Sequence, residues 1–68
     1  MRKNGYVLVR KSNNQPVHIG EYLHDFRGEL HILDGGEPPL SPSSTGRIST
    51  SKGEFFPQVL NLVWRRIL

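Results

Sequence analysis

The chain has no cysteine, and this absence excludes two common ways of stabilising a small domain. Neither a disulfide framework nor a zinc–thiolate site can form, so a core built from 68 residues must be held by packing alone. Folding of so short a chain removes only about 60% of its surface from water, and the core is expected to contribute only ~3 to 5 kcal/mol. A reducing compartment, or self-association, is therefore expected.

Long apolar runs and helical spacing are also missing. The apolar stretch Gly5–Val9 is too short for a secretion leader or a membrane span, and polar residues follow it. Glycine or proline interrupts nearly every window in which apolar residues could line one face of a helix. We therefore expect a cytoplasmic protein that has no membrane partner and is made of strands.

The first half of the chain contains short β-type segments separated by turn residues. Gly5–Arg10 is rich in β-branched and aromatic residues, and Leu30–Leu33 is a second such run. Between them, Val17–Leu23 changes its alternation at Gly20, which predicts a strand with a bulge or a sharp bend. Asp25–Glu29 then predicts a tight hairpin corner.

Three stretches are predicted to lie outside strands. Met1 to Asn4 is expected to fray, and Asp34–Gly36 is expected to end the strand that precedes it. Residues 37–43 hold three prolines and no periodicity, so they are predicted to form a rigid, exposed, Pro-rich loop.

The second half of the chain holds the strongest local pattern. Residues 47–51 alternate in the manner of a strand, and Lys52-Gly53 supplies a turn into Glu54–Phe56, which predicts a β-hairpin. Pro57 ends the second strand of this hairpin because it fixes φ. The next residues, Gln58–Asn61, have the length of one tight turn.

Together these segments predict an all-β fold, namely a single small domain over residues 1–68 that forms a five-stranded, strongly bent barrel. One short 3-10 turn precedes the last strand, which begins at Leu62–Trp64. Trp64 is expected in or beside the core. Phe55 and Phe56 point to opposite faces of their strand, so we expect one to enter the core. The other either covers the barrel end or lies on the surface as an anchor for a partner. We expect the first of these, with both rings buried at the corner between the strand and the turn.

Two resemblances to known families add to this prediction. Gly53–Leu60, with the sequence GEFFPQVL, resembles the closing segment of Src-homology-3 domains, in which a glycine, an aromatic residue and a proline precede a helical turn and the last strand. This resemblance implies a barrel of that type. It does not extend to the family's groove for proline-rich peptides, because the aromatic row is missing and Leu60 stands where the family places a tyrosine.

The second resemblance covers most of the chain. The motifs DFRGE (25–29), STGRI (44–48) and FPQV (56–59), together with Pro38-Pro39 and Trp64, are similar to a group of short uncharacterised proteins carried by bacteriophages and prophages. The resemblance implies a bacterial host-cell cytoplasm and a small accessory role, with no known activity.

Charge is distributed unevenly along the chain. The net charge is +3, with acidic residues concentrated in the middle of the chain and cationic residues near both ends. If the first and last strands are neighbours, these cations gather on one basic face, and small β-barrels use such faces to bind nucleic acid. The residues predicted to make these contacts are Arg2, Lys3, Arg10, Lys11, Arg65 and Arg66.

No residue pattern indicates catalysis, a cofactor or a metal. The histidines His18, His24 and His31 have spacings that match no ligand motif. Asp25 and Glu29 flank one turn and are more typical of a solvated loop than of a catalytic acid pair. We therefore predict a protein that is not an enzyme and has no catalytic, cofactor-binding or metal-binding residues.

The leading hypothesis is a small binding module, a phage-type accessory protein that binds a bacterial protein partner or self-associates. Rigid prolines lose little entropy when a loop docks, and arginine and aromatic side chains supply the largest energies at interfaces. The predicted partner surface consists of Phe26, Arg27, Pro38, Pro39 and Arg47. The alternative position for Phe26 is the core, and the alternative for Arg27 is an ion pair within its own turn. Nucleic-acid binding through the basic face is the second hypothesis.

Overall fold

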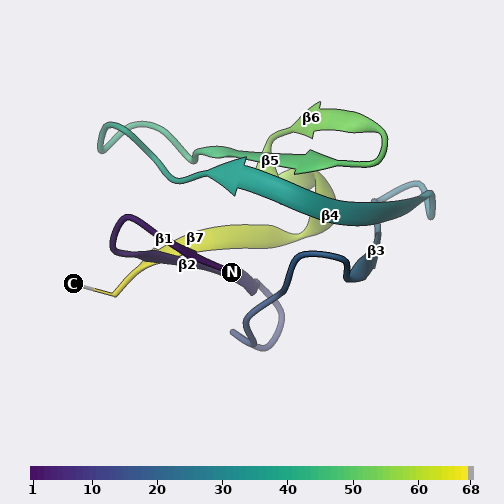
Figure 1. Cartoon of the computed structure of the whole chain (residues 1–68), viewed down its shortest axis with the longest axis horizontal. Helices are drawn as coiled ribbons and strands as arrows, with labels where there is room; N and C mark the ends of the chain where they lie inside the picture. The colour runs from purple at the N-terminus through teal and green to yellow at the C-terminus, as the bar shows by residue number, and fades with distance from the viewer. Residues whose placement is uncertain (68) are drawn as a thin grey trace.

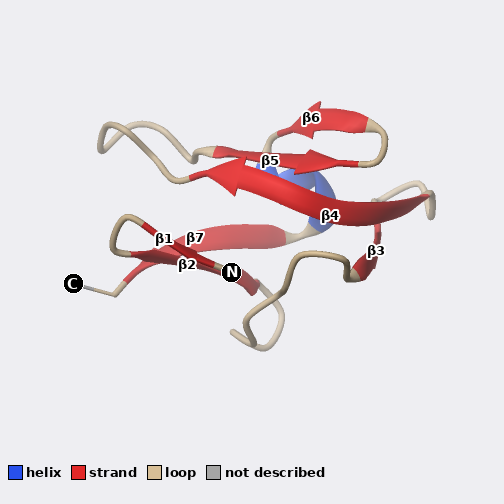
Figure 2. Cartoon of the chain, in the orientation of Figure 1, coloured by secondary structure: helices blue, strands red, loops and turns tan. Residues whose placement is uncertain are grey.

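A computed structural model describes residues 1–67 of the chain as seven short strands and one 3-10 turn connected by loops (Figure 1). Leu68 lies outside the described residues. The prediction of an all-β fold is confirmed (Figure 2). Within residues 1–67, no helix is long and apolar enough to cross a membrane. The elements are β1 (Arg2–Lys3), β2 (Tyr6–Arg10), β3 (Tyr22–His24), β4 (Leu30–Glu37), β5 (Arg47–Thr50), β6 (Gly53–Phe55), the 3-10 turn η1 (Pro57–Leu60) and β7 (Leu62–Arg66).

The described strands form two antiparallel sheets, where the sequence predicted one five-stranded barrel. The terminal sheet has the order β1-β2-β7, and the central sheet has the order β3-β4-β5-β6. Figure 1 shows β4, β5 and β6 of the central sheet above the terminal sheet and β3 below the right end of β4, with η1 joining β6 to β7. The core lies between the sheets because both contribute to it. It consists of Leu8, Val17, Leu23, Leu33, Ile48, Leu60, Leu62 and Trp64.

The predicted first strand, observed as β2, is a neighbour of the last strand, because β2 pairs with β7 along its whole length. The expectation that the chain frays at its start is wrong for Arg2 and Lys3, which form β1 and pair with β2. The connecting turn has φ values of 52° at Asn4 and 80° at Gly5. Asn-Gly is the pair that two-residue hairpin turns favour, so the sequence itself explains this strand.

A bent segment between β2 and β3 connects the two sheets, as η1 does between β6 and β7. Gly20 has a φ of 89° and bends the chain between Val17 and β3, as predicted. Before the bend, the N–H of Val17 donates to the carbonyl oxygen of Leu8 at 3.1 Å. After it, the N–H of Gly20 donates to the carbonyl oxygen of Leu33 at 2.7 Å. The segment therefore contacts β2 at one end and β4 at the other.

Strand β4 continues through Gly35 and Gly36, where the sequence predicted that the strand would end. The register shifts between Leu33 and Gly35, so the strand is irregular at this point. A Cβ on Gly36 would lie 3.0 Å from Trp64 Cζ2 and 2.8 Å from the carbonyl oxygen of Arg47. The glycine therefore allows the indole to pack directly against the backbone of β4 and does not mark a turn.

Trp64 lies in the core, as predicted, with 5% of its surface exposed. Its Nε1–H donates to the carbonyl oxygen of Arg47 at 3.2 Å, so a side chain of β7 is bonded to β5 in the other sheet. Phe55 is half-buried against the core, whereas Phe56 is 51% exposed. The expectation that both rings are buried at this corner is therefore wrong for Phe56, which lies on the surface. The tight turn that follows is η1, which begins one residue earlier than predicted.

Candidate functional site

The hairpin between β3 and β4 is organised by the side chain of Asp25. Its Oδ1 accepts the backbone N–H of Arg27 at 2.9 Å and that of Glu29 at 3.0 Å. Gly28, with a φ of 83°, closes the turn by donating its N–H to the carbonyl oxygen of Asp25 at 2.9 Å. An aspartate that accepts hydrogen bonds from its own turn fixes such a corner. The second carboxylate oxygen, Oδ2, is left to bond to His31.

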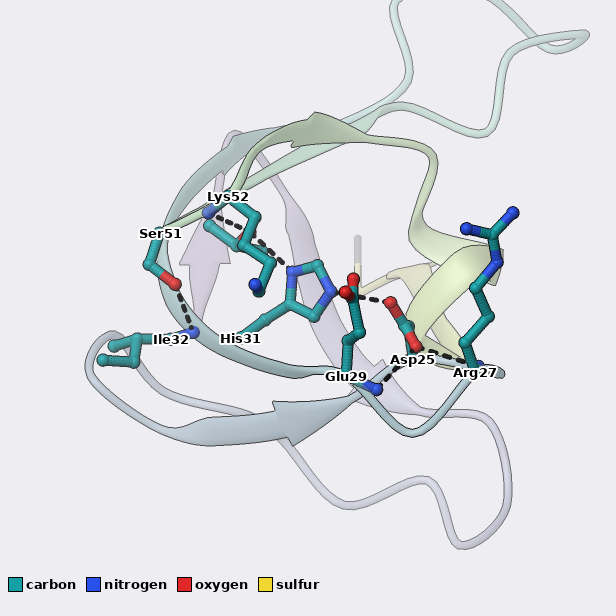
Figure 3. A network of polar contacts seen from close by, with 8 residues as sticks. Asp25, Arg27, Glu29, His31, Ile32, Ser51 and Lys52 are labelled. Atoms are coloured by element: carbon teal, nitrogen blue, oxygen red, sulfur yellow. Dashed lines mark hydrogen bonds and ion pairs between the residues drawn. The ribbon is translucent and has the colours of Figure 1, made fainter.

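His31, on β4, is only 1% exposed, and both of its ring nitrogens have partners (Figure 3). Nε2 lies 2.9 Å from Asp25 Oδ2, and Nδ1 lies 2.8 Å from Thr50 Oγ1. The Thr50 oxygen also accepts the backbone N–H of Lys52 at 3.1 Å. Because a carboxylate can only accept, Nε2 of the neutral ring carries the proton that faces Asp25, and Nδ1 accepts the hydroxyl proton of Thr50. His31 then donates its Nε2–H to Asp25. Every member of this network has a partner.

The network sets the ionisation of Asp25. The hydrogen bond from His31 lowers the pKa of the Asp25 carboxyl below its ordinary value, and the backbone N–H groups of Glu29 and Arg27 lower it further. Burial of the carboxyl acts in the opposite direction and is outweighed. Asp25 is therefore a carboxylate at neutral pH.

The carboxylate, imidazole and hydroxyl of this network lie in the order found in the triads of acyl-transfer enzymes. In such an enzyme the hydroxyl must reach a substrate, but Thr50 is only 4% exposed and already bonded to Lys52. The ring of Phe55 meets the ring of His31 edge-on, with 5.0 Å between the centroids. The network therefore links the hairpin to β4 and β5. That the chain is not an enzyme stays a prediction.

Both of the predicted partner-binding arginines lie over exposed aromatic rings. Arg27 Cζ is 5.5 Å from the centre of the Phe26 ring, and Phe26 is 79% exposed, so the alternative core position of Phe26 is wrong. Within residues 1–67, Arg27 takes part in no ion pair. Arg47 Cζ is 4.7 Å from the centre of the Phe56 ring. Stacking of this kind holds a guanidinium in place and leaves its N–H groups available to a ligand.

The loop after β4 is only partly exposed, which corrects the prediction of an exposed loop at 37–43. Glu37 belongs to β4, Pro38 is buried and Pro39 is half-buried, whereas residues 40–43 are exposed. Pro38 is therefore not available to a partner. Pro39 lines a groove of about 260 Å³, which the sequence did not predict. The other lining residues are Lys11, Ser44, Thr45, Pro57, Gln58, Leu62, Val63 and Trp64.

The terminal sheet brings the predicted basic residues together but divides them between its two faces. Arg2 lies opposite Val7, and Val7 lies opposite Arg65, so these two arginines share one face. Lys3 and Arg66 occupy the alternate positions, on the other face. The two ends of the chain are therefore adjacent, as expected, while the pleat separates their charges.

Two of these basic residues are engaged by acids of the chain itself. Lys3 Nζ lies 2.6 Å from a carboxylate oxygen of Glu37, and Arg10 forms an ion pair with Glu21. Lys11 lies beyond the end of β2 and lines the groove. Lys11 is thus the predicted basic residue that lines the groove. Arg2 and Arg65, which share one face of the terminal sheet, do not line it.

Comparison of the chain with protein-family models, with curated proteins and with solved structures gives no match. Its function must therefore be argued from its own geometry. Two features are available for that argument, namely the groove and the cluster of polar side chains around His31.

Proposed function

We propose that this chain is a small, non-enzymatic binding module that holds an extended segment of a protein partner in the groove. The observation that supports this proposal is the composition of the groove, in which Pro39, Pro57 and Trp64 are joined by the exposed polar residues Lys11 and Gln58. A concave, largely apolar surface with a few polar groups is typical of a ligand site. The two prolines come from the loop and from η1, so both walls are stiff and lose little entropy when a ligand binds.

The expected ligand segment carries an apolar side chain next to a carboxylate. The apolar side chain fits the prolines and the indole, and the carboxylate is attracted by Lys11, which is exposed at the groove. Arg47 adds a second cation nearby, because its carbonyl oxygen accepts the Nε1–H of the lining residue Trp64 and its side chain is held over Phe56. The net charge of +3 also favours an acidic partner.

The order of the strands supports a finer proposal about the fold, namely that the two sheets form a Src-homology-3-like arrangement. Strands β4, β5 and β6 form a meander, η1 follows β6, and β7 returns to pair with β2. This is the closing pattern that the GEFFPQVL segment resembles. With the second motif resemblance, we propose a phage-type accessory protein that works in the cytoplasm of a bacterial host, bound to a host protein or to a second copy of itself.

Photocrosslinking in a bacterial lysate tests the groove. A photoreactive residue at Gln58, which is exposed and lines the groove, should crosslink to a defined partner. The same residue at Glu54, which is exposed on β6 and does not line the groove, should not. Equal crosslinking from both positions would contradict the proposal.

Purified partner then allows the contribution of single arginines to be measured. Arg47→Ala should weaken binding about tenfold, because an arginine stacked on an aromatic ring is typical of an interface hot spot. The melting temperature should stay close to that of the wild type, since Arg47 is exposed. Arg2→Ala removes the same charge on the terminal sheet and is the matched control. Unchanged binding by Arg47→Ala would show that the partner lies elsewhere.

Nucleic-acid binding is the second candidate, and the position of Arg2 and Arg65 on one face of the terminal sheet favours it. Gel shifts with single- and double-stranded DNA and RNA at two salt concentrations test it. Affinity should fall steeply with salt, because phosphate contacts release counterions. Replacing both arginines by alanine should reduce the salt slope by about 1 to 2. Absence of a shift at low salt would exclude this candidate.

A further inference from the structure

Three metal-ligating side chains lie together at the base of the β3–β4 hairpin, namely those of Asp25, Glu29 and His31. One carboxylate oxygen from each acid and one ring nitrogen of the histidine all lie within 4.8 Å of one another. We propose that this cluster binds a divalent transition-metal ion, represented by Zn²⁺. Imidazole nitrogen and carboxylate oxygen are ligands that zinc takes in proteins, at about 2.0 to 2.2 Å.

The ligand atoms are already aimed at one another (Figure 3). The two backbone N–H groups that bond to Asp25 Oδ1 hold the carboxylate so that Oδ2 lies 2.9 Å from His31 Nε2. Two ligands of a tetrahedral zinc ion are about 3.4 Å apart, so these atoms must separate by only about half an ångström. Glu29 is exposed, so its longer side chain has room to complete the set.

The hydrogen bond between His31 Nδ1 and Thr50 Oγ1 can form both when the histidine binds a metal ion and when it does not. When Nε2 of His31 bonds to the ion, the ring proton must sit on Nδ1, which lies 2.8 Å from Thr50 Oγ1. That oxygen has two lone pairs, and the N–H of Lys52 uses one of them. The second lone pair accepts the Nδ1–H, and a partner of this kind is the usual support for a zinc-bound imidazole. Metal binding therefore needs a change of tautomer and a small separation of Asp25 Oδ2 from His31 Nε2.

The one other contact between a histidine and a carboxylate in residues 1–67 is weaker. His18 Nδ1 lies 3.7 Å from Glu21, but His18 is exposed and Glu21 already forms an ion pair with Arg10. That pair supplies two ligands and no buried imidazole, so it is a suitable control. At the proposed site, three protein ligands leave the fourth position of a tetrahedral ion for a water molecule.

Zinc titration of chelator-treated wild-type protein is the first experiment. We expect the melting temperature to rise with zinc concentration, because an ion that binds only the folded state stabilises it. Glu29→Gln replaces the carboxylate ligand by a neutral amide. Because Glu29 is exposed, the variant should fold, and it should bind zinc at least about tenfold more weakly than the wild type. His18→Gln is the matched control and should bind as the wild type does. No rise in melting temperature, full affinity in Glu29→Gln, or loss of binding in His18→Gln would overturn the proposal.

The tautomer of His31 provides a second readout that does not depend on folding of a variant. Nitrogen-15 NMR of the imidazole should detect the Nε2–H form in metal-free protein and the Nδ1–H form at saturating Zn²⁺. Addition of a chelator should restore the first form. Persistence of the Nε2–H form at saturating zinc would overturn the assignment of His31 as a ligand.

Discussion

Truncation of Trp64 to alanine removes the side chain that joins the two sheets. The indole is 5% exposed, packs on Gly36 and Gly46, and donates its Nε1–H to the carbonyl oxygen of Arg47 at 3.2 Å. Loss of a buried tryptophan side chain costs ~3 to 5 kcal/mol, and the carbonyl left without its partner adds ~1 kcal/mol. A core of this size contributes ~3 to 5 kcal/mol in all, so Trp64→Ala should be largely unfolded at room temperature.

Trp64→Phe separates the hydrogen bond of the indole from its packing. The smaller ring still fills most of the site but has no Nε1–H, so this variant should lose ~1 to 2 kcal/mol and remain folded. Urea unfolding followed by far-ultraviolet circular dichroism measures both variants, because each lacks the single tryptophan that fluorescence would follow. A wild-type midpoint for Trp64→Ala would refute the position of this residue as the link between the sheets.

Gly46 and Asp25 give two more tests by urea unfolding. A Cβ on Gly46 would lie 2.5 Å from the carbonyl oxygen of Glu37 and 2.8 Å from Trp64 Cδ1, so Gly46→Ala should lower the midpoint much further than Gly28→Ala. Gly28 also has positive φ, but no atom lies within 4 Å, and the expected cost there is only ~1 kcal/mol. Similar midpoints for the two alanine variants would contradict the close packing. Because the pKa of Asp25 is lowered by folding, its stabilising effect is present above about pH 4 and is lost as the pH falls through the folded pKa. In the presence of a chelator, the midpoint of the wild type should therefore fall more steeply with acid than that of Asp25→Asn, and parallel curves would show that another group is responsible.

The elements that sequence predicted well are those whose pattern is local. The β5–β6 hairpin follows from alternation and a Lys-Gly turn, and the bend at Gly20 follows from a change in alternation. Asn4-Gly5 carried an equally local hairpin signal, but it stood so near the start of the chain that fraying was expected. The neighbouring residues do not explain Gly36. A glycine is needed there because the indole of Trp64, from a distant part of the sequence, packs against the backbone of β4.

The groove and the second partner of His31 depend on contacts between distant segments, so the sequence alone could not predict them. The spacings of the three histidines match no ligand motif, whereas His31 lies beside Asp25 and Glu29 of the same hairpin. A buried imidazole needs partners for both nitrogens, and only the fold identifies Thr50 as the second one. The groove likewise exists only because the loop that contains Pro39 lies beside η1.

The pairing of β2 with β7 also sets the order in which this chain can fold. The β5–β6 hairpin joins residues that are close in sequence, so it can form early and often. Strand β2 lies near the start of the chain, whereas its main partner, β7, lies near the other end. Closing the long loop between them is entropically costly. Folding is therefore expected to be slow for a chain of this length, because its rate depends on a late encounter between the two ends.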